Sequence, residues 1–151
     1  MPTAIVSDTS CLILFYKIGE MDLLHKVYGL IIITGTVSQE FRRPLPDWIS
    51  VQDPKTNLHQ GLMSFLDAGE ATSIALALEL PDALLIIDES KGRRVAKELG
   101  VQITGSLGTV IAAKEKGVIQ SVKPIIEKIK KTNFRISDDL LNKILHLVNE
   151  K

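Results

Sequence analysis

Four acidic residues stand close to the ends of apolar runs in this chain: Asp8, Glu40, Glu70 and Asp88. Asp8 and Asp88 directly follow β-branched runs, while Glu40 and Glu70 lie in the first turns of helical patterns. Because ligands of open parallel sheets bind beyond the carboxyl ends of the strands, we expect all four to meet there. Converging carboxylates raise one another's pKa unless a cation neutralises them. Mg²⁺ and Mn²⁺ prefer oxygen ligands, so the pattern predicts one or two such ions.

A divalent ion held by carboxylates can bind a phosphodiester oxygen, lower the pKa of a water ligand and stabilise the leaving oxygen. The pattern therefore favours phosphodiester hydrolysis without a protein nucleophile. Ser10 and Cys11 lack an evident histidine partner for nucleophilic catalysis, and the three histidines lie in helical patterns without metal-ligand spacing. The chain also lacks the glycine-rich GxxxxGK[ST] phosphate loop.

Each acid also has a purely structural interpretation, which the sequence leaves open. Asp8 and Asp88 would suit the N-cap position of a helix, where an aspartate contributes about 1 kcal/mol. Glu70 has the spacing of a capping box with Asp67. Glu40 could be an ordinary exposed helix residue. Four acids gathered at one edge of a sheet favour a cation site over four unrelated caps.

The elements that must position these acids alternate between strands and helices. The strand candidates are Thr3–Ser7, Leu30–Thr34, Trp48–Gln52, Ala83–Ile87 and Val101–Ile103. Helices are predicted over Ser10–Ile18, Met21–Val27, a segment beginning at Thr36, Asn57–Leu66, Ala71–Leu80, Glu89–Leu99, Leu107–Lys116, Val122–Lys131 and Asp138–Val148. Apolar strands followed by helices predict an α/β fold, a three-layer α/β/α sandwich with a parallel sheet of about five strands.

Length and composition limit the class of protein. The 151 residues suit a single domain, 1–151, in which 118–151 form a C-terminal helical extension. Lys plus Arg and Asp plus Glu are 18 each, which argues against a generally cationic nucleic-acid binder. The lone cysteine, Cys11, excludes a disulfide framework. No signal peptide or membrane-spanning run is evident, so we expect a cytoplasmic protein without membrane partners.

Charge is distributed unevenly along the chain. Residues 1–113 carry nine basic and thirteen acidic side chains, whereas residues 114–135 carry seven basic and two acidic ones. An acidic body beside a basic segment is typical of a metal centre with a polyanion nearby. A solvated, lysine-rich helix face is the alternative interpretation.

The ordered motifs resemble those of the PIN domain superfamily, the metal-dependent ribonuclease fold of VapC-type toxins. The matching segments are IVSDTS (5–10), TVSQEF (36–41), DAGEA (67–71), LIIDE (85–89), GRRVA (92–96) and TGSLG (104–108). The Asp-x-Gly-Glu-Ala signature is similar to that of an uncharacterised branch of small prokaryotic PIN proteins. The resemblance implies Mg²⁺ or Mn²⁺, cleavage of single-stranded RNA, and catalytic and metal-ligating roles for Asp8, Glu40, Glu70 and Asp88. Glu70 departs from the aspartate common at this position in VapC toxins.

Several neighbouring residues acquire candidate roles from the resemblance. Thr9, Ser10 and Ser106 would orient water or phosphate through their hydroxyl groups, with helix capping as the alternative. Glu89 would be an additional ligand or a supporting acid, or simply a residue of the first helical turn. The candidate RNA-phosphate contacts are Arg42, Arg43, Lys91, Arg93 and Arg94.

These features lead to two functional hypotheses. The first is a Mg²⁺- or Mn²⁺-dependent endoribonuclease acting on single-stranded or structured RNA, such as the toxin of a toxin–antitoxin pair, with a small antitoxin protein and a second copy of the chain as partners. The alternative is a catalytically silent PIN-like protein that binds RNA or a protein. Aromatic residues make up only 5%, which makes readout by base stacking a weak prospect. Trp48 and Phe134 are candidate interface anchors or core residues.

Overall fold

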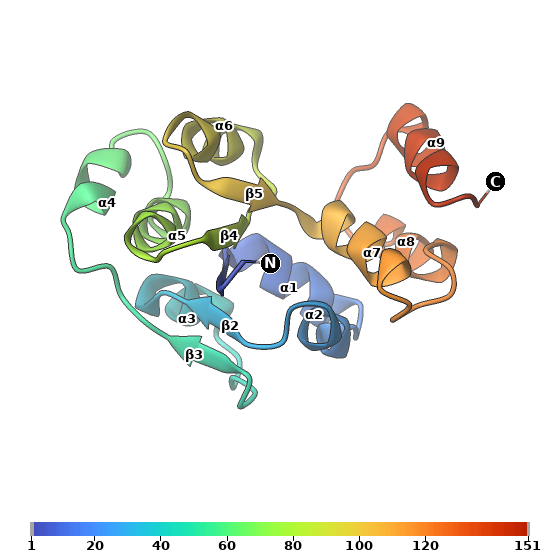
Figure 1. The fold of residues 1–151 in the computed structure, drawn as a ribbon, viewed down its shortest axis with the longest axis horizontal. Helices are drawn as coiled ribbons and strands as arrows, with labels where there is room; N and C mark the ends of the chain where they lie inside the picture. The colour runs from blue at the N-terminus through green and yellow to red at the C-terminus, as the bar shows by residue number, and fades with distance from the viewer. Residues whose placement is uncertain (1, 151) are drawn as a thin grey trace.

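The computed structural model describes residues 2–150 and contains one five-stranded sheet in which every pairing is parallel (Figure 1). The strands are β1 (Ala4–Ser7), β2 (Ile31–Ile33), β3 (Ile49–Val51), β4 (Ala83–Ile86) and β5 (Gln102–Thr104). Their order across the sheet is β3-β2-β1-β4-β5. The predicted α/β class with about five parallel strands is therefore confirmed.

Helices connect the strands and extend the chain beyond the sheet. They are α1 (Thr9–Lys17), α2 (Met21–Tyr28), α3 (Gly35–Phe41), α4 (Leu58–Leu62), α5 (Ala68–Glu79), α6 (Ser90–Glu98), α7 (Ser106–Glu115), α8 (Lys123–Lys130) and α9 (Asp138–Leu147). The predicted start of the third helix at Thr36 is wrong. Thr34 is its N-cap and accepts a hydrogen bond from the backbone N–H of Val37 at 3.2 Å, so the helix begins at Gly35.

The strand order places the topological switch point of the sheet between β1 and β4. β1 pairs with both β2 and β4, and its register with β4 runs from Ala4 opposite Ala83 to Ser7 opposite Ile86. From β1 the chain builds the sheet outwards on one side through β2 and on the other through β4. Loops diverge at such a switch and leave room for a ligand beyond the strand ends. Asp8 and Asp88 both emerge at this position.

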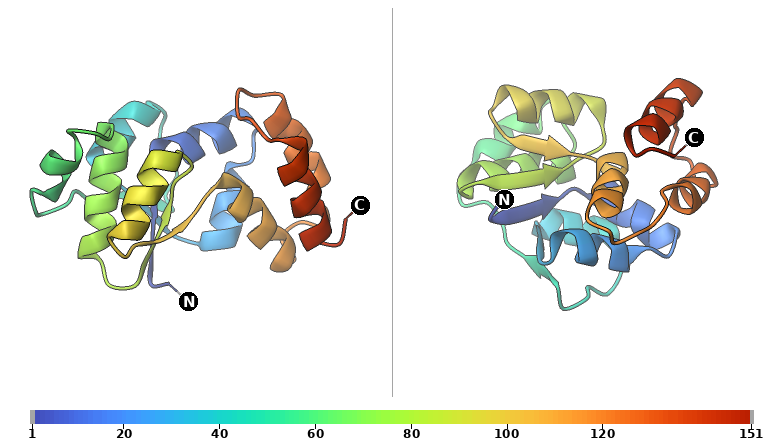
Figure 2. Two further views of the ribbon diagram at one scale, coloured as in Figure 1. Left: turned by 90° about the horizontal axis from the view of Figure 1, so that it is seen from above. Right: turned by 45° about the vertical axis from the view of Figure 1, so that its right-hand side comes forward.

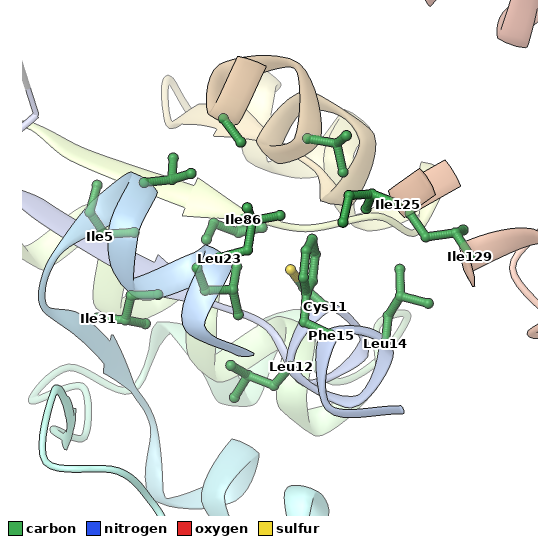
Figure 3. Packing of buried hydrophobic residues seen from close by; sticks show 14 of the residues in the cluster. Ile5, Cys11, Leu12, Leu14, Phe15, Leu23, Ile31, Ile86, Ile125 and Ile129 are labelled. Carbon is green, nitrogen blue, oxygen red and sulfur yellow. The ribbon is translucent and has the colours of Figure 1, made fainter. Parts of the chain in front are cut away.

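Both faces of the sheet are covered, so it forms the middle of three layers (Figure 2). On one face, Ile5 and Ile86 pack with buried residues of α1, α2, α7 and α8, as Figure 3 shows for Phe15 and Ile125. On the other face, residues such as Leu85 pack with α4, α5 and α6. This arrangement explains why the three central strands, β1, β2 and β4, are almost entirely apolar, whereas the edge strands β3 and β5 include polar residues.

The C-terminal helices join the first of these two cores. Ile125 and Ile129 of α8 and Ile144 of α9 belong to the same buried cluster as α1. The carboxylate of Glu150 fixes the end of the chain, because it accepts hydrogen bonds from Lys114 at 2.9 Å and from the backbone N–H of Val122 at 2.9 Å. Within residues 2–150, no helix combines the length and apolar character needed to cross a bilayer.

Candidate active site

Asp8 lies at the end of the central strand and begins α1. Its backbone N–H donates to the carbonyl oxygen of Ile86 at 2.9 Å, which ties the end of β1 to β4. Asp8 occupies the N-cap position, but its side chain makes no capping hydrogen bond. The residue is only 3% exposed. The capping interpretation therefore accounts for its backbone conformation and leaves the carboxylate available for another role.

The surroundings of Asp8 disfavour its charged form. Burial, together with the negative charges of Glu70, Asp67 and Glu40, raises the pKa of the carboxyl group from 3.8 to about 7. The backbone N–H of Thr9 acts in the opposite direction. A buried carboxylate surrounded by other acids lacks a compensating positive charge, and this is the environment that a bound cation would stabilise.

Glu40 joins this site through a hydrogen bond to the first residue of α1. Its Oε1 accepts from the hydroxyl of Thr9 at 2.6 Å, although Glu40 as a whole is exposed. The two side chains and Asp8 converge on Gly69: a Cβ placed there would contact Glu40 Oε1 and would lie 3.0 Å from Thr9 Oγ1 and 3.3 Å from Asp8 Oδ1. A side chain at residue 69 would therefore displace the Glu40 carboxylate from its present position.

Glu70 approaches the same site from the first turn of α5. Its backbone N–H donates to Asp67 Oδ1 at 2.8 Å, which is half of the predicted capping box. Glu70 is only 4% exposed, and its Oε2 lies 3.1 Å from where a Cβ on Gly92 would stand. Burial, together with the negative charges of Asp67 and Glu89, raises the pKa of Glu70 from 4.5 to about 7. Asp8, Glu40 and Glu70 are called the acidic cluster below.

Asp88 follows β4, but its carboxylate is held by Ser106, the first residue of the helix that follows β5. Oδ1 accepts from the backbone N–H of Ser106 at 2.7 Å, and Oδ2 accepts from its hydroxyl at 2.6 Å. Asp88 does not cap α6. That position belongs to Glu89, whose Oε2 accepts from the backbone N–H groups of Lys91 at 2.9 Å and Gly92 at 3.1 Å. The structure therefore gathers three of the four predicted acids and holds the fourth against the start of α7.

The donor chemistry of the acidic cluster fits a hard divalent ion, because the carboxylates of Asp8, Glu40 and Glu70 supply oxygen atoms only. Their present positions are not those of a finished site: among residues 2–150, no group of three or more His, Cys, Asp or Glu side chains is arranged to hold a metal ion.

The predicted supporting residues have distinct places. Thr9 holds Glu40, and Ser106 holds Asp88, so each hydroxyl orients one acid. Ser10 is exposed at the first turn of α1 and lines an open cleft. The carboxylate of Glu89 caps the N-terminus of α6. This agrees with the alternative interpretation of Glu89 as a residue at the start of the helix.

The predicted basic contacts lie on both sides of the site. Arg42 and Arg43 are exposed at the end of α3, and the Arg43 guanidinium lies 4.9 Å from the centroid of the Tyr16 ring. Lys91 is exposed at the start of α6, with its ammonium group 5.9 Å from the centroid of the Phe65 ring.

Two further arginines follow along α6. Arg93 is half-buried and donates to the carbonyl oxygen of Ile87 at 2.7 Å, while Arg94 is exposed. Arg93 lines a cleft together with Asp88, whereas Arg94 lines a shallower one with Ser90. Arg93 is thus the predicted α6 arginine that comes close to an acidic site residue.

Lys17, which the sequence analysis did not select, also lines this surface. It lines the cleft that contains Ser10 and Asp88, together with Phe134 from the connection between α8 and α9. The spacing of Ser10, Ile13 and Lys17 places them on one helix face, which was a usable signal for Lys17. Phe134 lies far along the chain from α1, so no local pattern connects the two.

Comparison with known proteins agrees with this fold. A family model described as a PIN domain matches residues 4–150. The chain belongs to the PIN domain family. A search of curated proteins found no match. PIN domains are in general nucleases that bind nucleic acids and use divalent metal ions. The prediction from the sequence motifs that this chain is a PIN domain is thus confirmed.

Proposed function

We propose that this chain is a Mg²⁺- or Mn²⁺-dependent endoribonuclease that hydrolyses phosphodiester bonds of RNA. The observation that carries the proposal is the convergence of Asp8, Glu40 and Thr9 on the space above Gly69, with the buried carboxyl group of Glu70 one residue further along α5. Family membership supports nuclease chemistry, and the oxygen-only donor set supports a hard divalent ion.

In this proposal Asp8, Glu40 and Glu70 hold the ion, with Asp88 completing the set. The ion would supply positive charge to a phosphodiester oxygen and would lower the pKa of water. The protein's own contribution is positioning: Thr9 fixes the Glu40 carboxylate, Ser106 fixes the Asp88 carboxylate, and Gly69 lets α5 approach closely enough for Glu70 to join them. The exposed Arg42 and Arg43 lie beside Glu40, where they can bind phosphates on that side of the cluster.

The direct test is cleavage of labelled single-stranded RNA with Mg²⁺, Mn²⁺ or EDTA. We expect cleavage that EDTA abolishes and that Asp8→Asn and Asp88→Asn both lose. Asp47→Asn is the matched control, because Asp47 is exposed in the loop before β3 and is not among the residues that line the clefts containing Glu40 or Asp88. Cleavage that persists unchanged in both active-site variants would come from a contaminating nuclease and would contradict the proposal.

A catalytically silent protein that binds RNA or a protein partner is the second candidate. It is favoured by one observation, namely that residues 2–150 contain no three-ligand group already arranged for a metal. Calorimetric titration with Mn²⁺ separates the two candidates without relying on activity. Binding that is lost in Asp8→Asn supports the enzyme, whereas absence of Mn²⁺ binding together with intact RNA binding supports the silent protein.

We further propose that the enzyme acts as the toxin of a toxin–antitoxin pair and forms homodimers. The acidic cluster could bind a basic side chain of a small antitoxin, whose positive charge would take the place of the metal ion. A short upstream reading frame with a DNA-binding N-terminus would support this role. Co-expression provides the functional test, since the partner should suppress both growth inhibition and RNA cleavage.

A further inference from the structure

Three clefts follow one another along the carboxyl edge of the sheet. The first, of about 140 Å³, includes Glu40, Arg43 and Lys17. The second, of about 470 Å³, shares Lys17 with the first and extends to Asp88 and Phe134. The third, of about 530 Å³, is in turn lined by Asp88 and Phe134. Shared lining residues connect the three clefts into one path, which we call the edge path.

Phe134 stands where the second and third clefts of the edge path meet. It belongs to the connection between α8 and α9, which Figure 2 shows at the same end of the molecule as α1. Thr132 fixes this connection, because its hydroxyl donates to Ile129 O at 2.6 Å and accepts from the backbone N–H of Phe134 at 3.1 Å. Ser137 closes the other end by capping α9. The ring is therefore presented by a structured turn and is only partly buried.

Basic side chains accompany the edge path over its whole length. Arg43 and Lys17 line the first cleft, Lys17 also lines the second, and Arg93 and Arg135 line the third. A chain of phosphates needs such repeated positive charge, and its bases need flat apolar surfaces. Only unpaired nucleotides can turn their bases onto a protein ring. The edge path thus offers a single strand both kinds of contact beside Asp88.

From these observations we infer that the C-terminal extension takes part in substrate binding: Phe134 stacks against a base of single-stranded RNA, and Arg135 binds an adjoining phosphate. This inference builds on the proposed function by assigning substrate contacts to a segment outside the acidic motifs. It also revises the expectation that stacking is a weak prospect, because one aromatic residue at the junction of two clefts is sufficient for a local contact.

The test measures binding in EDTA, so that it does not depend on hydrolysis. The probes are a short fluorescein-labelled single-stranded RNA and the same ribose-phosphate strand without bases, followed by fluorescence anisotropy at fixed salt. Phe134→Leu keeps an apolar side chain but removes the ring. We expect it to weaken RNA binding by about tenfold while leaving binding of the abasic strand unchanged. Leu30→Ala, which shortens an exposed apolar side chain outside the edge path, should leave the affinity for both strands unchanged.

Arg135→Gln provides the complementary measurement. It should weaken binding of both strands and reduce the salt dependence of each, because it removes a phosphate contact. Equal affinities of Phe134→Leu and the unchanged protein for RNA would overturn the inference. Equal losses on both strands together with a lower melting temperature would also overturn it, since Phe134 would then serve packing alone. If RNA is bound through Phe134 but never cleaved with Mn²⁺, the inference stands and the proposed nuclease function fails.

Discussion

Ser106 donates two hydrogen bonds to the carboxylate of Asp88, one from its backbone N–H at 2.7 Å and one from its hydroxyl at 2.6 Å. Asp88 follows β4, whereas Ser106 begins α7 after β5. The position of the Asp88 carboxylate is therefore set by the start of α7 and not by α6, the helix that follows Asp88 in the chain. Ser106 is fully buried, whereas Asp88 is half-buried and lines two of the clefts, so the hydroxyl is held in place while the carboxylate still faces solvent.

Replacing Ser106 by Ala should weaken this link without removing it. The hydroxyl bond to a charged acceptor is lost, which costs about 1.5–3 kcal/mol, while the backbone N–H remains. We expect urea unfolding to show this loss and RNA cleavage to fall partially, in contrast to the complete loss expected for Asp88→Asn. The exposed Ser10 supplies the control: Ser10→Ala should leave stability unchanged. Full activity in Ser106→Ala would show that Asp88 needs no such support.

Gly69→Ala should disrupt the acidic cluster while preserving the helix. The added Cβ would contact Glu40 Oε1 and crowd Thr9 Oγ1 and Asp8 Oδ1, so the Glu40 carboxylate must move away from Asp8. We expect a large loss of cleavage and of Mn²⁺ binding. Gly61→Ala in α4 is the matched control, because nothing lies within 4 Å of its Cβ. It should retain activity and gain about 0.5–1 kcal/mol of stability from helix propensity. Normal Mn²⁺ binding in Gly69→Ala would contradict the assignment of the cluster.

Local sequence patterns were sufficient for the strands and for the place of Asp8 and Asp88 at the strand ends, but not for the contacts that these side chains make. The β-branched runs before Asp8 and Asp88 predicted strand ends because a buried parallel strand is apolar on both faces. Thr34 was assigned to a strand when it is in fact a helix cap, since a buried threonine suits either position. The hydrogen bond of Asp88 to Ser106 and the place of Phe134 beside α1 arise from tertiary packing across many residues. No short-range periodicity encodes them.

Asp8→Asn should stabilise the metal-free protein at alkaline pH. The folded-state pKa of Asp8 is raised from 3.8 to about 7, so the folded protein binds this proton more tightly than the unfolded chain. Stability from this group is therefore greatest below pH 4 and is lost as the pH rises towards 7. Thermal unfolding in EDTA should show the variant more stable than the unchanged protein by about 2–4 kcal/mol at pH 8, with the difference vanishing near pH 4. A variant less stable at both pH values would contradict this account.

With Mn²⁺ in place of EDTA, the unchanged protein should become more stable than Asp8→Asn at pH 8. An ion that binds only the folded protein raises its stability by mass action, and Asp8 is one of its proposed ligands. We expect Mn²⁺ to raise the melting temperature of the unchanged protein at pH 8 by several degrees, and to have little effect on Asp8→Asn. Ca²⁺, which is larger and accepts different geometry, serves as the control ion. Equal shifts in both proteins would place the ion elsewhere.

Glu150 should make the docking of the C-terminus sensitive to acid. Hydrogen bonds from Ser121 and Lys114 lower the pKa of Glu150 from 4.5 to about 2. A lowered carboxyl pKa gives stability that is complete above pH 4.5 and is lost as the pH falls towards 2. Glu150→Gln should therefore be less stable than the unchanged protein in urea at pH 7, and the difference should narrow steadily as the pH approaches 2. Glu127→Gln removes a looser exposed pair, 3.7 Å from Lys130, and should change little at any pH. A difference for Glu150→Gln that stayed constant down to pH 2 would mean that the carboxylate charge has no part in holding α9.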